Sequence, residues 1–282
     1  MKGFINLIKP SNVTSAAVVS VVKKKLNTPC GHMGTLDPMA SGVLPIGIGK
    51  ASRLFQYMLD KKKKYIAEFT FGILTDTLDS TGEIVQTTNV IPSEKQIEEN
   101  LKFFIGKISQ VPPKYSAKCI AGKRGYQLAR AGVDFELKPK EVEILDYKLV
   151  KKVSENVYRF EIDCKGGTYI RSLARDLGFK CNSLAVMSSL IRAESGFFTL
   201  ENGISLEEFK SSNDIEKYLI PAEQTVNFEK IYLNDEQARK ILNGVYENYG
   251  FRDGLYRVYY EKEFLGVGLS TNGALKINSY VR

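Results

Sequence analysis

Histidine and cysteine are scarce in this chain. Its 282 residues contain one histidine, His32, and four cysteines that lie far apart: Cys30, Cys119, Cys164 and Cys181. A structural zinc site needs closely spaced Cys or His ligands, and a Cys-His nucleophile needs both residue types. With one histidine and widely spaced cysteines, we expect neither a metal site nor a Cys-His nucleophile. A glycine motif of the nucleotide-hydrolase type is also missing, so the sequence implies no nucleotide cofactor.

Long apolar runs are missing as well. No run approaches the roughly 20 apolar residues that span a bilayer, and no charged-then-apolar leader opens the sequence. Together with the few cysteines, this predicts a protein of the reduced cytoplasm that does not contact a membrane. The length and a hydrophobic content of 43% permit one large domain and one small one.

Acidic residues are rare in the first 65 positions. Eleven Lys or Arg residues stand there against two acids, Asp37 and Asp60, and the whole chain carries a net charge of +8. Residues 228–282 hold eight basic and seven acidic side chains, so the basic surface lies upstream. This distribution favours a polyanionic partner such as a nucleic acid.

Asp37 stands in the segment 31–45, which is dense in glycine and proline. The glycines permit backbone torsions that other residues avoid, and Pro38 restrains Asp37 to an extended conformation. Such a loop can hold a catalytic carboxylate rigidly. Asp before Pro is also a common opener of turns, so a purely structural role is the alternative. The positive surroundings favour the catalytic interpretation.

The hydrophobic pattern predicts an α+β fold. Residues 65–71 alternate as a half-buried strand does, further strands fit 142–150 and 157–164, and Ser93 with Gln96 predicts the start of a helix over 93–105. A helix after Thr168 buries an apolar stripe and displays Arg171 and Arg175 on its other side. Without regular strand-helix alternation, we expect a mixed, largely antiparallel sheet.

The chain is predicted to contain two domains. A linker at 221–227 separates residues 1–222 from residues 228–282, where a short helix and strands at 255–260, 264–269 and 274–278 form a β-rich module. The larger domain contains a basic insertion at about 107–140. Eight Lys or Arg residues are interleaved there with aromatic residues, a mixture typical of RNA binding, although a solvated loop and helix would look similar. Lys123 and Arg124 mark its tip.

A second pair of acids, Asp76 and Asp79, lies in the segment 75–82. The segment is too short for a calcium-binding hand. Its hydroxyls and carboxylates can satisfy a turn, so we expect a structural role for Asp79, while Asp76 stays open.

Several segments together resemble one family. They are Lys9-Pro10 with Thr14-Ser15, residues 31–45, Lys64-Tyr65, Phe71-Gly72, residues 75–82, residues 111–117 and residues 167–171. In this order they resemble the bacterial tRNA pseudouridine synthases of the TruB family, which isomerise uridine 55 in the T loop. The likeness runs from about residue 3 to 200, and residues 228–282 are similar, more weakly, to the PUA RNA-binding module.

The resemblance implies a role for each matching residue. Asp37, in the signature Gly-Thr-Leu-Asp-Pro, would be the catalytic nucleophile. Tyr65 would stack on the target uracil or also act as a base, and Arg171 would pair with the aspartate. His32 would fill the gap left by flipped nucleotides, and Tyr169 and Leu190 would line the uridine pocket. Asp76, Lys123 and Arg124 are candidate RNA contacts. A monomer that binds the T arm of tRNA without a cofactor is implied.

The sequence departs from the family pattern at two places. Asn12 replaces a glycine, which is mild because Asn tolerates left-handed turns, and residues 188–192 carry fewer arginines than usual. Two alternatives stay open. The same chemistry on another RNA would share the catalytic residues, whereas a noncatalytic RNA-binding or RNA-folding protein would not need Asp37 and Arg171 together.

Overall fold

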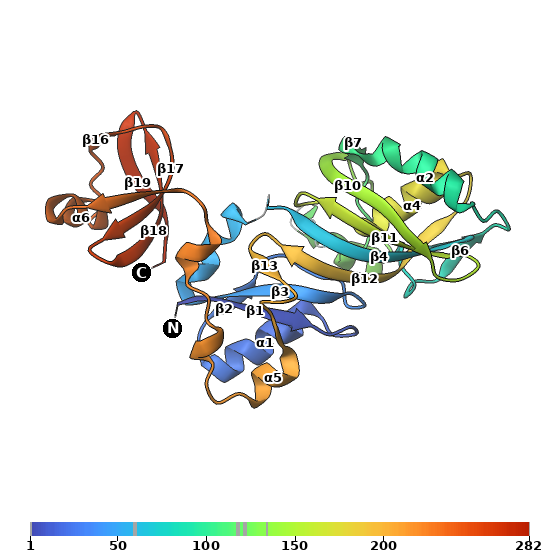
Figure 1. Cartoon of the computed structure of the whole chain (residues 1–282), viewed down its shortest axis with the longest axis horizontal. Helices are drawn as coiled ribbons and strands as arrows, with labels where there is room; N and C mark the ends of the chain where they lie inside the picture. The colour runs from blue at the N-terminus through green and yellow to red at the C-terminus, as the bar shows by residue number, and fades with distance from the viewer. Residues whose placement is uncertain (1, 59–60, 117–118, 121–122, 134, 282) are drawn as a thin grey trace.

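A mixed sheet forms the larger part of the molecule (Figure 1). The computed structural model describes residues 2–58, 61–116, 119–120, 123–133 and 135–281. Ten strands follow the order β14 (Ile204–Ser205), β1 (Gly3–Lys9), β3 (Ser41–Ile48), β12 (Ala185–Ser195), β4 (Lys63–Phe71), β11 (Val157–Cys164), β10 (Lys140–Lys152) and β7 (Gly106–Gln110), with β2 (Cys30–His32) on β3 and β13 (Phe198–Thr199) on β12.

Antiparallel pairs dominate this sheet. Among its strand pairs, β1 with β14 and β3 with β12 are parallel. The predicted α+β class with a mixed, largely antiparallel sheet is confirmed. In the central strand β4 every second residue is buried, as the alternation at 65–71 predicts. Two hairpins flank the sheet: β5 (Ile73–Thr75) with β6 (Ile84–Thr87), and β8 (Cys119–Ile120) with β9 (Lys123–Arg124).

Helices pack at two ends of the sheet (Figure 1). α1 (Ser15–Leu26) contacts β2 and α5 (Leu206–Ser211) contacts β1, while α2 (Glu94–Leu101) packs on β10 and α4 (Ile170–Lys180) on β12. Ser93 and Gln96 form the predicted capping box, and the 3₁₀ turn η2 (Lys102–Phe104) continues α2. The remaining short helices are η1 (Gly49–Tyr57), α3 (Gly125–Arg130) and η3 (Glu216–Tyr218).

The residues after 228 form a second, five-stranded sheet. Its order is β15 (Glu229–Leu233), β17 (Gly254–Tyr260), β18 (Glu263–Thr271), β19 (Gly273–Tyr280) and β16 (Asn248–Phe251), and α6 (Asp235–Leu242) packs on it. The three strands expected in this part are present. The small sheet lies beside the N-terminal end of the chain (Figure 1) and is consistent with a PUA-like module.

Hydrophobic packing joins the two sheets. Phe4 and Val43 of the larger sheet share one buried cluster with Val267 of the smaller one and with Val281, which follows its last strand. The segment predicted to be a linker takes part in this packing, because η4 (Ala222–Thr225) buries Ala222 in the same cluster. The segment is therefore partly packed: Ala222, Thr225 and Val226 are buried, whereas Pro221, Gln224 and Asn227 are exposed. Among the helices that the structure describes, none is long and apolar enough to cross a bilayer.

Candidate active site

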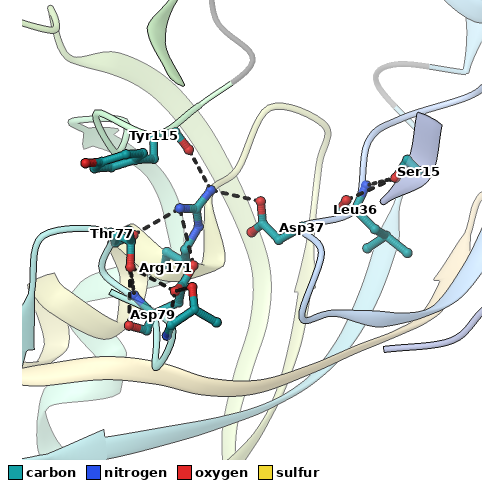
Figure 2. Close-up of polar contacts among 8 residues, drawn as sticks. Ser15, Leu36, Asp37, Thr77, Asp79, Tyr115 and Arg171 are labelled. Carbon is teal, nitrogen blue, oxygen red and sulfur yellow. Dashed lines mark hydrogen bonds and ion pairs between the residues drawn. The ribbon is translucent and has the colours of Figure 1, made fainter. Parts of the chain in front are cut away.

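Asp37 opens a turn in the loop between β2 and β3. Its backbone carbonyl accepts a hydrogen bond from the N–H of Ala40 at 3.1 Å. Ser15, at the start of α1, anchors the preceding residue: its hydroxyl accepts from the Leu36 N–H at 2.9 Å and donates to the Leu36 carbonyl at 3.0 Å (Figure 2). The turn uses the backbone of Asp37, which leaves the carboxylate available for other partners.

Arg171, at the start of α4, is the partner of this carboxylate. Its Nη2 lies 2.8 Å from Asp37 Oδ1 and also donates to the Tyr115 carbonyl at 2.9 Å, while Nη1 donates to the Thr77 carbonyl at 2.9 Å (Figure 2). The prediction that Arg171 is displayed on the helix surface is wrong, because the residue is only 5% exposed. A carboxylate and two carbonyls replace the water that its guanidinium loses on burial.

Asp79 is a second carboxylate beside the same arginine. Its Oδ2 lies 3.5 Å from Arg171 Nη1, and its Oδ1 accepts hydrogen bonds from the Thr77 hydroxyl at 2.8 Å and the Thr81 N–H at 3.0 Å. Asp79 therefore organises its turn, as predicted, and also faces Arg171. Within the described ranges, no group of three or more His, Cys, Asp or Glu side chains could hold a metal ion.

A cavity of about 310 Å³ opens beside Asp37. Five residues that the sequence analysis singled out line it together: Asp37, Tyr65, Tyr169, Arg171 and Leu190. Tyr65 and Leu190 are buried, whereas the Asp37 side chain keeps 29% of its surface exposed. The carboxylate can thus be reached from the cavity.

His32 and Asp76 are not among the described residues that line this cavity. His32 is half-buried at the end of β2. Asp76 is exposed; its carboxylate accepts from the Glu83 N–H at 2.9 Å and lines a separate groove. Lys123 and Arg124 form β9, but their side chains lie outside the described part of the structure.

Burial changes the acidity of Asp37 and Tyr65, which both line the cavity. It raises the pKa of Asp37 above its ordinary value; Arg171 opposes this rise, and Asp79 adds to it. Burial also raises the pKa of Tyr65 to about 12, although the Arg192 guanidinium acts in the opposite direction. The Tyr65 phenol is therefore protonated at neutral pH.

Two buried cations near the cavity, Lys9 and Arg192, were not predicted from the sequence to be site residues. Lys9 is fully buried, and its Nζ donates to the carbonyls of Pro10 (2.9 Å), Val13 (2.6 Å) and Pro38 (3.1 Å), so it ties the loop of Asp37 to the end of β1. Burial lowers its pKa to about 8. Arg192 is 1% exposed and lines the cavity. The Lys9-Pro10 pair carried part of the resemblance, but its spacing in the sequence indicated no role.

The fold is that of a pseudouridylate synthase. The chain belongs to the TruB family: the model described as TruB family pseudouridylate synthase (N terminal domain) matches residues 23–170. Proteins named tRNA pseudouridine synthase B are similar over almost the whole chain. The protein from Alkaliphilus oremlandii is 42% identical, over 96% of this chain and 94% of its own length, and that from Clostridium kluyveri is 40% identical, over 98% of each.

Solved structures agree with this assignment. An H/ACA RNP bound to a substrate RNA containing 2′-deoxyuridine matches with a TM-score of 0.71 and 26% identity, over 99% of this chain and 85% of that one. A Cbf5-Nop10-Gar1 complex matches with a TM-score of 0.70 and 27% identity, over 98% and 79%.

Proposed function

We propose that this chain converts uridine 55 in the T loop of tRNA to pseudouridine, with Asp37 as the nucleophile and without a cofactor. The observation that carries the proposal is the ion pair of 2.8 Å between Asp37 and Arg171 at the wall of a cavity that Tyr65 also lines. The names of the similar proteins, which match this chain over nearly their whole length, support tRNA as the substrate.

The reaction needs one well-placed carboxylate. The reaction breaks the N1–C1′ bond of uridine, turns the uracil and joins C5 to C1′. The C5 proton leaves to solvent and N1 gains a proton. The product is an isomer, so no external reactant is consumed. Asp37 can attack C1′, attack C6 or remove the C2′ proton, and each route begins with the ionised form. Arg171 favours that form against the effect of burial.

The cavity has the walls that a detached uracil needs. The Tyr65 ring offers a stacking surface, and Tyr169 and Leu190 enclose the base from other sides. A Tyr65 pKa of about 12 favours stacking over proton abstraction as the role of this residue. The base would thus stay in place while it turns above Asp37.

A base within folded RNA must leave its stack to enter this cavity. His32 lies at the end of the strand that leads to Asp37, and burial lowers its pKa, so its imidazole is neutral at physiological pH. A neutral ring can take the place of the extruded nucleotides without adding a buried charge. We assign this role to His32.

The remaining surfaces would hold the T arm. We propose that residues 1–222 form the catalytic domain, that Lys123 and Arg124 of its basic insertion contact phosphates, and that Asp76 faces the RNA from the neighbouring groove. Residues 228–282 would bind RNA as a PUA-like domain. We further propose that the protein acts as a monomer in the cytoplasm.

Tritium release from C5 of labelled uridine in an unmodified tRNA transcript tests this function. Wild type should release tritium, Asp37→Asn should not, and Asp214→Asn serves as a matched control because this exposed residue lies outside the cavity. Asp37→Asn should bind tRNA as wild type does, within a few-fold. Turnover by Asp37→Asn would contradict the nucleophile assignment. No release by wild type, with tight tRNA binding, would indicate another RNA substrate or a binding protein.

A further inference from the structure

Arg192 holds both ends of the loop that carries Asp37. Its Nε donates to the Val43 carbonyl at 2.7 Å, and its Nη2 donates to the Gly34 carbonyl at 3.0 Å. Gly34 precedes Asp37 and Val43 follows it, so one planar guanidinium bridges the entry and the exit of the loop. The two backbone carbonyls replace part of the hydration that this buried charge has lost.

The backbone of Arg192 lies where three strands meet. In β12 it pairs with Gly42 of β3 on one side and with Tyr65 of β4 on the other. The approach to β3 is so close that a Cβ on Gly42, whose φ is +103°, would lie 2.3 Å from the Arg192 carbonyl oxygen. A residue other than glycine would push the strands apart. Arg192 therefore connects the strand that ends the Asp37 loop to the strand that carries Tyr65.

The side chain makes the same connection from within the cavity wall. Its guanidinium lies close enough to the Tyr65 phenol to oppose the rise of the Tyr65 pKa, and its charge acts on His32, at the start of the loop. Arg171 contacts the Asp37 carboxylate, whereas Arg192 contacts the backbone on both sides of it. The two arginines thus have different tasks.

We propose that Arg192 is a positioning residue that sets the Asp37 loop at a fixed place relative to Tyr65, and so aims the carboxylate at a base stacked on that ring. The proposal rests on the proposed function. A lysine cannot substitute fully, because all of its N–H donors lie on one nitrogen. The guanidinium donates to Val43 and Gly34 from two separate nitrogens in a rigid plane.

The test compares Arg192→Lys and Arg192→Gln with Arg159→Met, an arginine of the same sheet whose side chain is 38% exposed and pairs with Glu68. Single-turnover pseudouridine formation should fall roughly 10- to 100-fold in both Arg192 variants, because a small misplacement of a reacting group is costly. Affinity for tRNA should stay near wild type. Amide exchange of residues 34–40 should become faster, and Arg159→Met should change none of these.

The chain's only histidine gives a second readout that does not depend on catalysis. Because the Arg192 charge lowers the pKa of His32, the NMR titration of this imidazole should move to higher pH in Arg192→Gln. If wild type forms no pseudouridine, the proposed function fails, while amide exchange and the His32 titration still test how Arg192 holds the loop. Arg192→Lys with the wild-type rate and unchanged exchange at 34–40 would overturn the inference. If Arg192→Gln does not fold, the rate and amide exchange of Arg192→Lys alone test the inference.

Discussion

One buried guanidinium serves two carboxylates: Arg171 Nη2 lies 2.8 Å from Asp37 Oδ1, and its Nη1 lies 3.5 Å from Asp79 Oδ2 (Figure 2). The Asp79 side chain is 7% exposed and is held by two hydroxyls and one N–H group of its turn, whereas the Asp37 side chain is 29% exposed. Asp79 is thus the fixed partner, and it orients Arg171 toward the carboxylate that faces the cavity.

Removal of this fixed partner should slow the reaction. We expect Asp79→Asn to lower the single-turnover rate roughly 10- to 100-fold, because the Arg171 guanidinium loses the charge that orients it. Asp214→Asn removes an exposed carboxylate outside the cavity and should leave the rate near wild type. Equal rates for the two variants would show that Asp79 serves only its turn.

The pH dependence should change in a defined direction. The proposed reaction requires ionised Asp37, so the rate should fall as pH drops through the pKa of this carboxyl, which burial raises above the ordinary value of about 3.9. Asp79 contributes to that rise by charge repulsion. Asp79→Asn should therefore move the acidic limb of the pH-rate profile to lower pH. A limb that moves to higher pH would mean that weaker support from Arg171 outweighs the lost repulsion.

The buried carboxylate should also cost stability. Because the folded protein raises the pKa of Asp37, folding disfavours the ionised form, and wild type gains stability as pH falls through that pKa. Asp37→Asn should accordingly unfold at a higher temperature than wild type at pH 7. The difference should shrink as pH falls through the pKa of Asp37, because protonated Asp37 resembles the amide. A lower midpoint for the variant at pH 7 would show that the pair with Arg171 stabilises more than burial costs.

Local patterns predicted the elements of the fold well, because their signals lie within a few residues. The alternation in β4 and the capping box of Ser93 and Gln96 are examples. The pairing of strands depends on contacts between distant residues. The parallel pair of β3 with β12, which joins Gly42 to Arg192, leaves no periodic trace in either strand.

Less of the candidate site than of the fold could be predicted from local sequence patterns. The glycine-rich setting of Asp37 indicated a rigid loop, but its partner Arg171 came from family resemblance, and helical periodicity placed that arginine in solvent. Helical periodicity predicts that a cation lies on the solvent-exposed face, because it contains no information about a carboxylate 134 residues away in the sequence. The roles of Lys9 and Arg192 were not predicted because their hydrogen-bond acceptors are backbone carbonyls, which are present at every position of any sequence.

Lys9 offers a test of how the loop contributes to stability. Lys9→Met leaves the carbonyls of Pro10, Val13 and Pro38 without their common donor, and we expect the free energy of unfolding to fall by roughly 1–3 kcal/mol. Lys25→Met is a matched control, because Lys25 also donates to two carbonyls but is exposed; its effect should be about 0.5 kcal/mol or less. Urea unfolding measures both. Equal decreases in the free energy of unfolding for the two variants would mean that the buried Lys9 contributes no more to stability than the exposed Lys25.

The basic insertion should reveal itself in the salt dependence of tRNA binding. Each phosphate contact releases counterions, so replacing Lys123 and Arg124 together with Ala should reduce the slope of log affinity against log salt by about 1 to 2 and weaken binding most at low salt. The double variant of Lys107 and Lys148 removes the same charge, but these cations already pair with Glu141 and Asp146 and should affect the slope less. An unchanged slope for the first variant would place the phosphate contacts elsewhere on the chain.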